Sequence, residues 1–169
     1  PDLIGWGRSD HPARDYQAED YVAIITEFIE QTCSGPTTVI ASALTAAFTV
    51  RAAINRPELF KSLILTTVAG LAEFDQDYRR SGFAQFAQYV SQPVLSQLLY
   101  GFGVANSFGI RSFLEQRQFA VPGRVYPEMV EAYLQSAKQE NGEYAALSFV
   151  RGDLCFDLSQ YITQLTVPT

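Results

Sequence analysis

The stretch Ile40-Ala-Ser-Ala-Leu-Thr-Ala-Ala47 decides the fold of this 169-residue chain. It overlaps a β-branched run, residues 37–41, that has no polar alternation and follows a Gly-Pro pair. Such a run predicts a short strand buried on both faces, as in a parallel sheet. Small residues then lead into a predicted helix over about 45–55, whose alanines permit close packing on a sheet. The stretch therefore predicts a strand, a sharp turn and a helix.

The segments on either side continue the same alternation. Apolar residues recur every three or four positions between Gln17 and Thr32, which predicts an amphipathic helix. A second apolar run over 61–68 predicts another buried strand. Residues 17–68 thus alternate helix, strand, helix and strand, so the predicted fold class is α/β, with the central part of a parallel sheet and flanking helices.

The pattern changes after Gly70, where no convincing buried strand occurs before residue 165. This segment is rich in Phe and Tyr, and most of these rings are expected to form the core of a helical insertion. The final residues, 166–169, are expected to lead into the next strand. The predicted helices span 82–100, 109–119, 127–140, 143–151 and 158–165, with Asn141-Gly142 as the stop after the third.

The composition excludes several classes of protein. The chain is 47% hydrophobic and 18% charged, which is enough apolar material for a core. Twelve basic and eighteen acidic residues give a net charge of −6, so nucleic acid and anionic lipid are unexpected partners. No apolar run approaches the roughly 20 residues of a membrane span.

The two cysteines, Cys33 and Cys155, are far apart, and His11 is the single histidine. These numbers exclude a disulfide framework and a Cys/His metal site. The absence of a basic and apolar leader favours the cytoplasm. Because the sequence starts with proline rather than methionine, we expect it to be an internal piece of a longer protein.

The turn between the predicted strand and helix has the pattern of a nucleophile elbow, small-x-nucleophile-x-small. In such a turn the backbone is so tight that the flanking side chains must be nearly absent. The strained bend lifts the nucleophile clear of the sheet, and the next backbone N–H points at the developing oxyanion.

With this motif the chain resembles the α/β-hydrolase family. Asp2-Leu-Ile-Gly-Trp-Gly-Arg-Ser-Asp10 is similar to the family's D-x-x-G-x-G-x-S loop after a sheet strand. Residues 56–60 and 63–65 look like the usual link into the strand after the elbow, and Leu165-Thr-Val-Pro-Thr169 resembles the entry to the strand that carries the catalytic acid. The motifs follow one another in the family's order along the whole chain.

The resemblance places Ala43 at the nucleophile position, between small flanking positions at Ala41 and Thr45. Alanine has no nucleophilic atom. The Leu44 backbone N–H would be one oxyanion donor, whereas the acid, the histidine and the second donor would lie outside the sequence. The resemblance implies no metal and no organic cofactor.

Other residues near the turn offer alternatives. Ser42 would serve as nucleophile only with Ile40 and Leu44 as its flanks, and a hydroxyl bonded locally to backbone is its ordinary role. Thr45 is expected to be an oxygen acceptor at the helix start. His11 is expected to be a solvated loop residue, and Trp6 either lines a pocket entrance or packs on the first helix.

Two further sets of charged residues have simple structural interpretations. Asp153 and Asp157 suggest paired carboxylates, but Asp157-Leu-Ser159 also looks like the start of a helix. Single arginines in an acidic domain usually pair with surface acids rather than bind a carboxylate substrate. The arginines concerned are Arg111, Arg117 and Arg151.

The resemblance divides the chain into a partial core over 1–70, a helical cap over 71–165 and the start of a core strand over 166–169. It implies a parent protein that hydrolyses an ester, thioester or similar bond of a small apolar substrate, with this chain inactive because of Ala43. The alternative is a natural non-catalytic homologue that binds a small apolar ligand or a protein partner. A third interpretation is an interaction module whose aromatic cap is the binding face.

The opening loop also resembles that of haloalkane dehalogenases, which carry aspartate at the elbow. The sequence does not define an oligomeric state.

Overall fold

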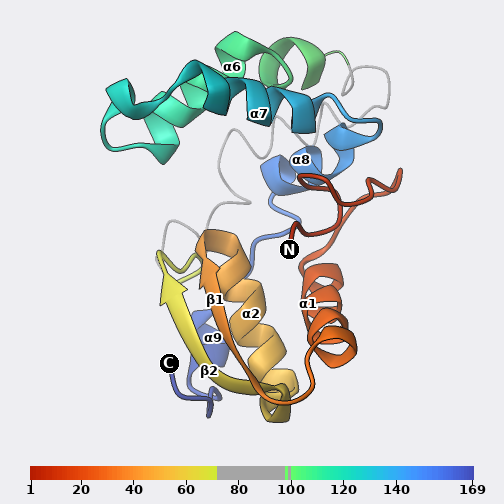
Figure 1. Cartoon of the computed structure of the whole chain (residues 1–169), viewed down its shortest axis with the longest axis vertical. Helices are drawn as coiled ribbons and strands as arrows, with labels where there is room; N and C mark the ends of the chain where they lie inside the picture. Colours follow the sequence, from red (N-terminus) through yellow and green to blue (C-terminus); the bar gives the residue numbers. More distant parts are fainter. Residues whose placement is uncertain (72–97, 99) are drawn as a thin grey trace. The chain divides into compact units, whose positions relative to one another are not determined.

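A computed structural model describes residues 1–71, 98 and 100–169 of the chain (Figure 1). By their contacts the residues form two compact units. The helical unit consists of Pro1–Asp15 and Phe86–Val150, and the sheet unit consists of Tyr16–Gln85 and Arg151–Thr169.

The sheet unit contains two parallel strands, β1 (Thr37–Ser42) and β2 (Phe60–Thr66). In Figure 1 they run side by side, with helix α2 (Ala43–Asn55) packed along them. A short 3-10 turn, η1 (Pro57–Leu59), connects α2 to β2. Parallel strands require a crossover, and α2 supplies it. The predicted α/β alternation is therefore present.

Helix α1 (Ala18–Thr32) packs on α2 and confirms the helix predicted over 17–32. At its start the side chain of Asp20 accepts the backbone N–H of Gln17 at 2.8 Å, which satisfies one of the unpaired donors of the first turn. The buried face of α1 includes Tyr21 and Ile25, each at most 8% exposed. The three-and-four spacing predicts this face, except that Phe28, which the spacing also places on it, is 42% exposed.

The prediction that both strands are buried on both faces is wrong for the described residues. Ile40 and Ile64 are direct partners in the parallel register, yet they are 73% and 50% exposed. On the opposite face Ala41 and Leu63 are buried beneath the helices. Within the described part of the chain, helices cover only one face of this two-stranded sheet.

The segment after the helical unit returns to the sheet unit. The amide of Leu158 donates to the carbonyl of Gly70 at 2.8 Å, and the short helix α9 (Ser159–Ile162) follows. Residues 166–169 form no strand here, but the amide of Leu63 donates to the Pro168 carbonyl at 2.8 Å. The end of the sequence therefore lies along β2.

The helical unit has an aliphatic core made by Ile110, Leu114, Val125, Val130 and Leu134. The expectation that its aromatic rings are mostly core is wrong for Phe102 and Phe108, which are 83% and 84% exposed. The elements of this unit are η3 (Tyr100–Val104), α6 (Ser107–Phe113), η4 (Leu114–Gln118), η5 (Pro122–Arg124), α7 (Pro127–Ala137) and α8 (Gly142–Arg151, ending at the unit boundary). The turns η3 and η4 are π-helical, and η5 is 3-10.

The boundary between α7 and α8 differs from the predicted one. Helix α7 ends at Ala137, and Gly142 begins α8 instead of stopping α7. Asn141 has a left-handed backbone (φ +63°), so the stop signal in the sequence marks the turn before α8. Most of the helix predicted over 82–100 lies outside the described residues. None of the described helices combines the length and apolar character needed to cross a membrane.

Candidate functional site

The junction of β1 and α2 has the backbone geometry of a very tight bend. Ser42 is extended (φ −134°, ψ 151°), and Ala43 has a φ of +52° and begins α2. A left-handed backbone at a residue other than glycine is uncommon because the Cβ crowds the following carbonyl. The strand therefore reverses into the helix within a single residue, Ala43.

The neighbouring strand end is strained in the same way. Thr67, directly after β2, has a φ of +47°, which is unfavourable for a β-branched residue. The Ala69 amide donates to the Ala43 carbonyl at 3.3 Å, and the hydroxyls of Ser42 and Thr67 lie 3.5 Å apart. These two contacts connect the two strand ends at the edge where both strands finish. Strained backbone persists only where the surrounding structure holds it.

The methyl group of Ala43 lies at the surface of the sheet unit, as does the side chain of Ser42. Leu44 is half-buried in the first turn of α2, where backbone N–H groups have no acceptor within the helix. These amides carry the positive end of the helix dipole. The bend thus presents a methyl group, a hydroxyl and donor-rich backbone at one place.

Ser42 and Thr45 do not have the local hydrogen-bonding roles that were predicted for them. Thr45 lies inside α2, whose N-terminal cap is Ser42, and the Thr45 carbonyl accepts the Thr49 hydroxyl at 2.8 Å. Thr45 as a helix cap is therefore wrong, because the helix starts two residues earlier than predicted. Ser42 makes no side-chain capping bond to α2, and its nearest described polar contact is Thr67.

An aromatic series holds α2 in place within the sheet unit. Tyr21 and Phe48 stack with centroids 5.0 Å apart, and Phe48 continues to Phe156 at 6.2 Å. The guanidinium of Arg51 lies 5.3 Å from the Phe156 centroid and 3.9 Å from that of Tyr161. Rings and cation together join α1, α2 and the segment after residue 150, which fixes the helix that begins at Ala43.

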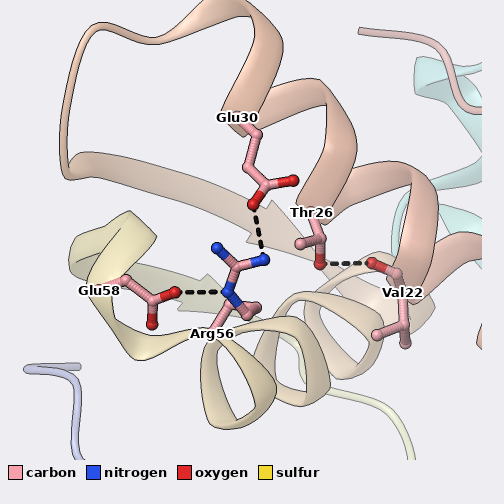
Figure 2. Close-up of polar contacts among 5 residues, drawn as sticks. All are labelled: Val22, Thr26, Glu30, Arg56 and Glu58. Atoms are coloured by element: carbon pink, nitrogen blue, oxygen red, sulfur yellow. Dashed lines mark hydrogen bonds and ion pairs between the residues drawn. The ribbon is translucent and has the colours of Figure 1, made fainter.

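A polar cluster at the C-terminal end of α2 connects this helix to α1 and η1 (Figure 2). Arg56 contacts Glu30 of α1 at 2.6 Å and also pairs with Glu58 of η1. The hydrogen bond from Arg56 lowers the pKa of the Glu58 carboxyl, and the two carboxylates raise the pKa of Arg56. All three side chains are substantially exposed, so this cluster orients the ends of elements more than it stabilises the unit.

The remaining charged candidates whose side chains are described have structural partners. Arg111 pairs with Glu115 at 3.1 Å, and Arg151 pairs with Asp153 at 2.7 Å. Asp157 accepts the Ser159 amide at 3.0 Å at the start of α9. The segment from Asp157 to Ser159 starts a helix as predicted, but the N-terminal cap is Leu158 rather than Asp157 or Ser159. Arg111 and Arg151 pair with acids as expected, although the side chain of Arg151 is mostly buried. The side chain of Arg117 lies outside the described residues.

The interpretation of His11 as a solvated residue is wrong. Both ring nitrogens of His11 are buried, and neither has a hydrogen-bond partner among the described residues. The sequence carried no signal for this burial, since His11 stands among polar and turn-forming residues of the opening loop. Trp6 in the same loop is 38% exposed.

Described residues of the sheet unit line shallow surface hollows. One is lined by residues 32–37, and another lies between α1 and α2, where Arg51 and Glu19 are among the lining residues. Residues 42–45 line neither hollow. The described residues contain no group of three or more His, Cys, Asp or Glu side chains placed to hold a metal ion.

Comparison with known proteins identifies the fold. No protein-family model matches the chain, and no curated protein matches it significantly in sequence. Solved structures do match. Cfl2 from Burkholderia cenocepacia has a TM-score of 0.65 and 24% identity, with 97% of this chain and 55% of that one covered. The epoxide hydrolase CorEH has a TM-score of 0.73 and 15% identity, with coverage of 99% and 62%.

A haloalkane dehalogenase, DatA from Agrobacterium tumefaciens C58, matches with a TM-score of 0.64 and 17% identity, covering 97% of this chain and 55% of that one. These matching structures share the α/β-hydrolase fold. The chain therefore has the α/β-hydrolase fold, and the predicted fold class is confirmed. It spans 55% to 62% of the length of these three structures.

Proposed function

We propose that the bend at Ala43 is the nucleophile elbow of a hydrolase-type site, and that alanine at this position leaves the site without a nucleophile. The observation that carries the proposal is the left-handed backbone of Ala43 between a strand and a helix. An ordinary strand-to-helix connection has no need of this strain, whereas an elbow requires it to raise one side chain above the sheet.

The surroundings of Ala43 support an oxyanion site. The amide of Leu44 follows the bend in the first turn of a 13-residue helix, so its donor and the helix dipole would act on the same developing charge. A carbonyl substrate held above Ala43 would be polarised there, but no atom of the alanine side chain would attack it. The reaction class assigned to the parent protein is hydrolysis of an ester, thioester or similar bond in a small apolar substrate.

The catalytic acid, the histidine and the second oxyanion donor would come from segments outside this sequence. The share of the matching structures that the chain covers supports this view, since roughly two fifths of each lies outside the match. In this proposal residues 71–165 form the cap, and the bound molecule is small and apolar. We assign the protein to the cytoplasm and assign it no metal or organic cofactor.

A non-catalytic homologue that binds an apolar ligand or a protein partner is the second candidate. Thr45 favours it, because a side chain larger than glycine or alanine at the second flank is tolerated where no reactive group must be held. Placing a nucleophilic side chain at position 43 separates the two candidates. The coding sequence extended at both ends should be expressed with Ala43→Ser and assayed with p-nitrophenyl esters, and with Ala43→Asp and assayed for halide release.

If the Ala43→Ser variant hydrolyses the esters and the unsubstituted protein does not, the result supports the hydrolase. Halide release by Ala43→Asp would shift the assignment to the chemistry of the dehalogenase-like loop. If both variants fold and neither turns over, while the protein binds an apolar fluorescent probe, the non-catalytic candidate replaces the hydrolase.

A further inference from the structure

The opening loop, residues 1–15, is bonded to the end of α7 through one peptide. The Gly7 amide donates to the Ser136 hydroxyl at 3.1 Å, and the Gln139 side-chain amide donates to the Gly7 carbonyl at 2.7 Å. One residue thus has both of its backbone groups held by side chains about 130 positions away. Both contacts lie within the helical unit.

Further contacts involve the backbone on both sides of these hydrogen bonds, at Gly7 and at the end of α7. Gly7 has a left-handed backbone (φ +59°), and a Cβ there would collide with the carboxylate of Asp2. The same carboxylate accepts the Arg8 amide at 3.0 Å. At the other end, the Tyr100 hydroxyl donates to the Ala137 carbonyl at 2.9 Å, at the last residue of α7 and between Ser136 and Gln139.

The loop held in this way contains an unfavourable group. The ring nitrogens of His11 are buried, and no described residue bonds to either of them. A buried donor or acceptor without a partner costs free energy that it recovers when it reaches water. Other interactions must therefore stabilise the observed loop conformation, and the hydrogen bonds of Gly7 with Ser136 and Gln139 do so.

We propose that Ser136 and Gln139 form a clamp on the Gly7 peptide that holds the opening loop in its His11-buried state, and that release of the clamp exposes His11. The loop is then a two-state element, and the clamp sets the balance between the states. This inference concerns the helical unit alone and is independent of the role of Ala43.

The chain offers two residue-specific probes of the loop, because Trp6 and His11 are its single tryptophan and single histidine. Acrylamide quenching of fluorescence reports the accessibility of Trp6, and the rate of diethylpyrocarbonate modification at 240 nm reports that of His11. The clamp is removed by Ser136→Ala combined with Gln139→Leu. The matched control is Gln135→Leu on the exposed side of the same helix, where the amide contacts only Glu131 among the described hydrogen bonds.

Loss of two hydrogen bonds should increase the open fraction, and hence the modification rate of His11, about tenfold. Trp6 quenching should rise as well, while Gln135→Leu leaves both readouts at their parent values. Each single substitution should give a smaller increase, and these variants carry the test if the double variant does not fold. An unchanged His11 rate in a folded clamp variant overturns the proposal. An equal increase in the control overturns it too, because the effect would then be general loosening of α7.

Discussion

The Ala69 amide donates to the carbonyl of Ala43, so the loop after β2 is bonded to the residue at which β1 turns into α2. Together with the left-handed Thr67, this bond joins the two strand ends at one edge of the sheet. Side chains of different chain segments meet at such an edge, which is where open α/β sheets bind their ligands. The strain at Ala43 is therefore supported from the adjacent strand.

Relieving that strain should stabilise the protein. Ala43→Gly should raise the free energy of unfolding by about 1 kcal/mol, because glycine adopts a positive φ without the crowding of a Cβ. Urea unfolding followed by circular dichroism measures this change. Ala23→Gly is the matched control, since Ala23 is exposed in the middle of α1, and it should instead lower stability by about 1 kcal/mol. Loss of stability in Ala43→Gly would contradict the left-handed bend.

The contact of Arg51 with Tyr161 should contribute measurably to the docking of α2 against the segment after residue 150. Arg51→Met and Tyr161→Leu should each destabilise the protein, and a double-mutant cycle should give a coupling of about 0.5–1 kcal/mol. Chemical unfolding of the four proteins measures it. A coupling of zero would mean that the guanidinium does not lie over this ring in solution.

The Arg56 cluster should make stability depend on acid. The pKa of Glu58 in the folded protein is lowered from its ordinary value of 4.5 by the bond from Arg56. Its contribution is therefore present above pH 4.5 and is lost as the pH falls from there through the lowered folded pKa. Glu58→Gln should remove a small part of the acid-induced loss of stability, and 1 M salt should weaken the contribution at neutral pH.

Thermal unfolding measured across this acidic range checks the prediction. Identical acid profiles for the parent protein and Glu58→Gln would show that the pair does not form.

Tyr100 should give the opposite dependence at high pH. Burial, with a smaller contribution from the negative charge of Glu143, raises its pKa from 10.0 to about 12. The neutral phenol is favoured in the folded state, so its contribution is complete below pH 10 and is lost as the pH rises from 10 to about 12. Tyr100→Phe should flatten the stability profile in this window. The same substitution should cost about 1 kcal/mol at neutral pH, through loss of the bond to Ala137.

Absorbance at 295 nm tests the Tyr100 assignment directly. The chain has nine tyrosines, and subtracting the Tyr100→Phe curve from that of the unsubstituted protein isolates the signal of Tyr100. A difference curve centred near pH 10 would contradict the buried environment.

The elements of the sheet unit were predictable because each has a local cause in the sequence. The spacing of Tyr21 and Ile29 predicts α1, and the unbroken β-branched run predicts β1. The start of α2 was predicted two residues late, since nothing in the composition of the stretch reveals that Ala43 already has its left-handed backbone and begins the helix. That conformation depends on contacts from Ala69 and from α2 packing on the sheet.

Features that depend on tertiary contacts were not predictable. The ring nitrogens of His11 are buried, and a single histidine among turn residues carries no period from which to infer this. The exposure of Phe102 and Phe108 likewise follows from a short π-helical turn and the seven-residue α6. The Gly7 contacts join residues about 130 positions apart, and no short-range pattern encodes them.

The most direct test of the central claim is the site of covalent labelling by a fluorophosphonate in the extended protein carrying Ala43→Ser, mapped by tandem mass spectrometry. The account predicts a label on the hydroxyl introduced at position 43, its persistence when Ser42→Ala is added, and no label in the parent sequence. A label on Ser42 in the parent sequence would contradict it, because the reactive side chain at the bend would then be the neighbour of Ala43.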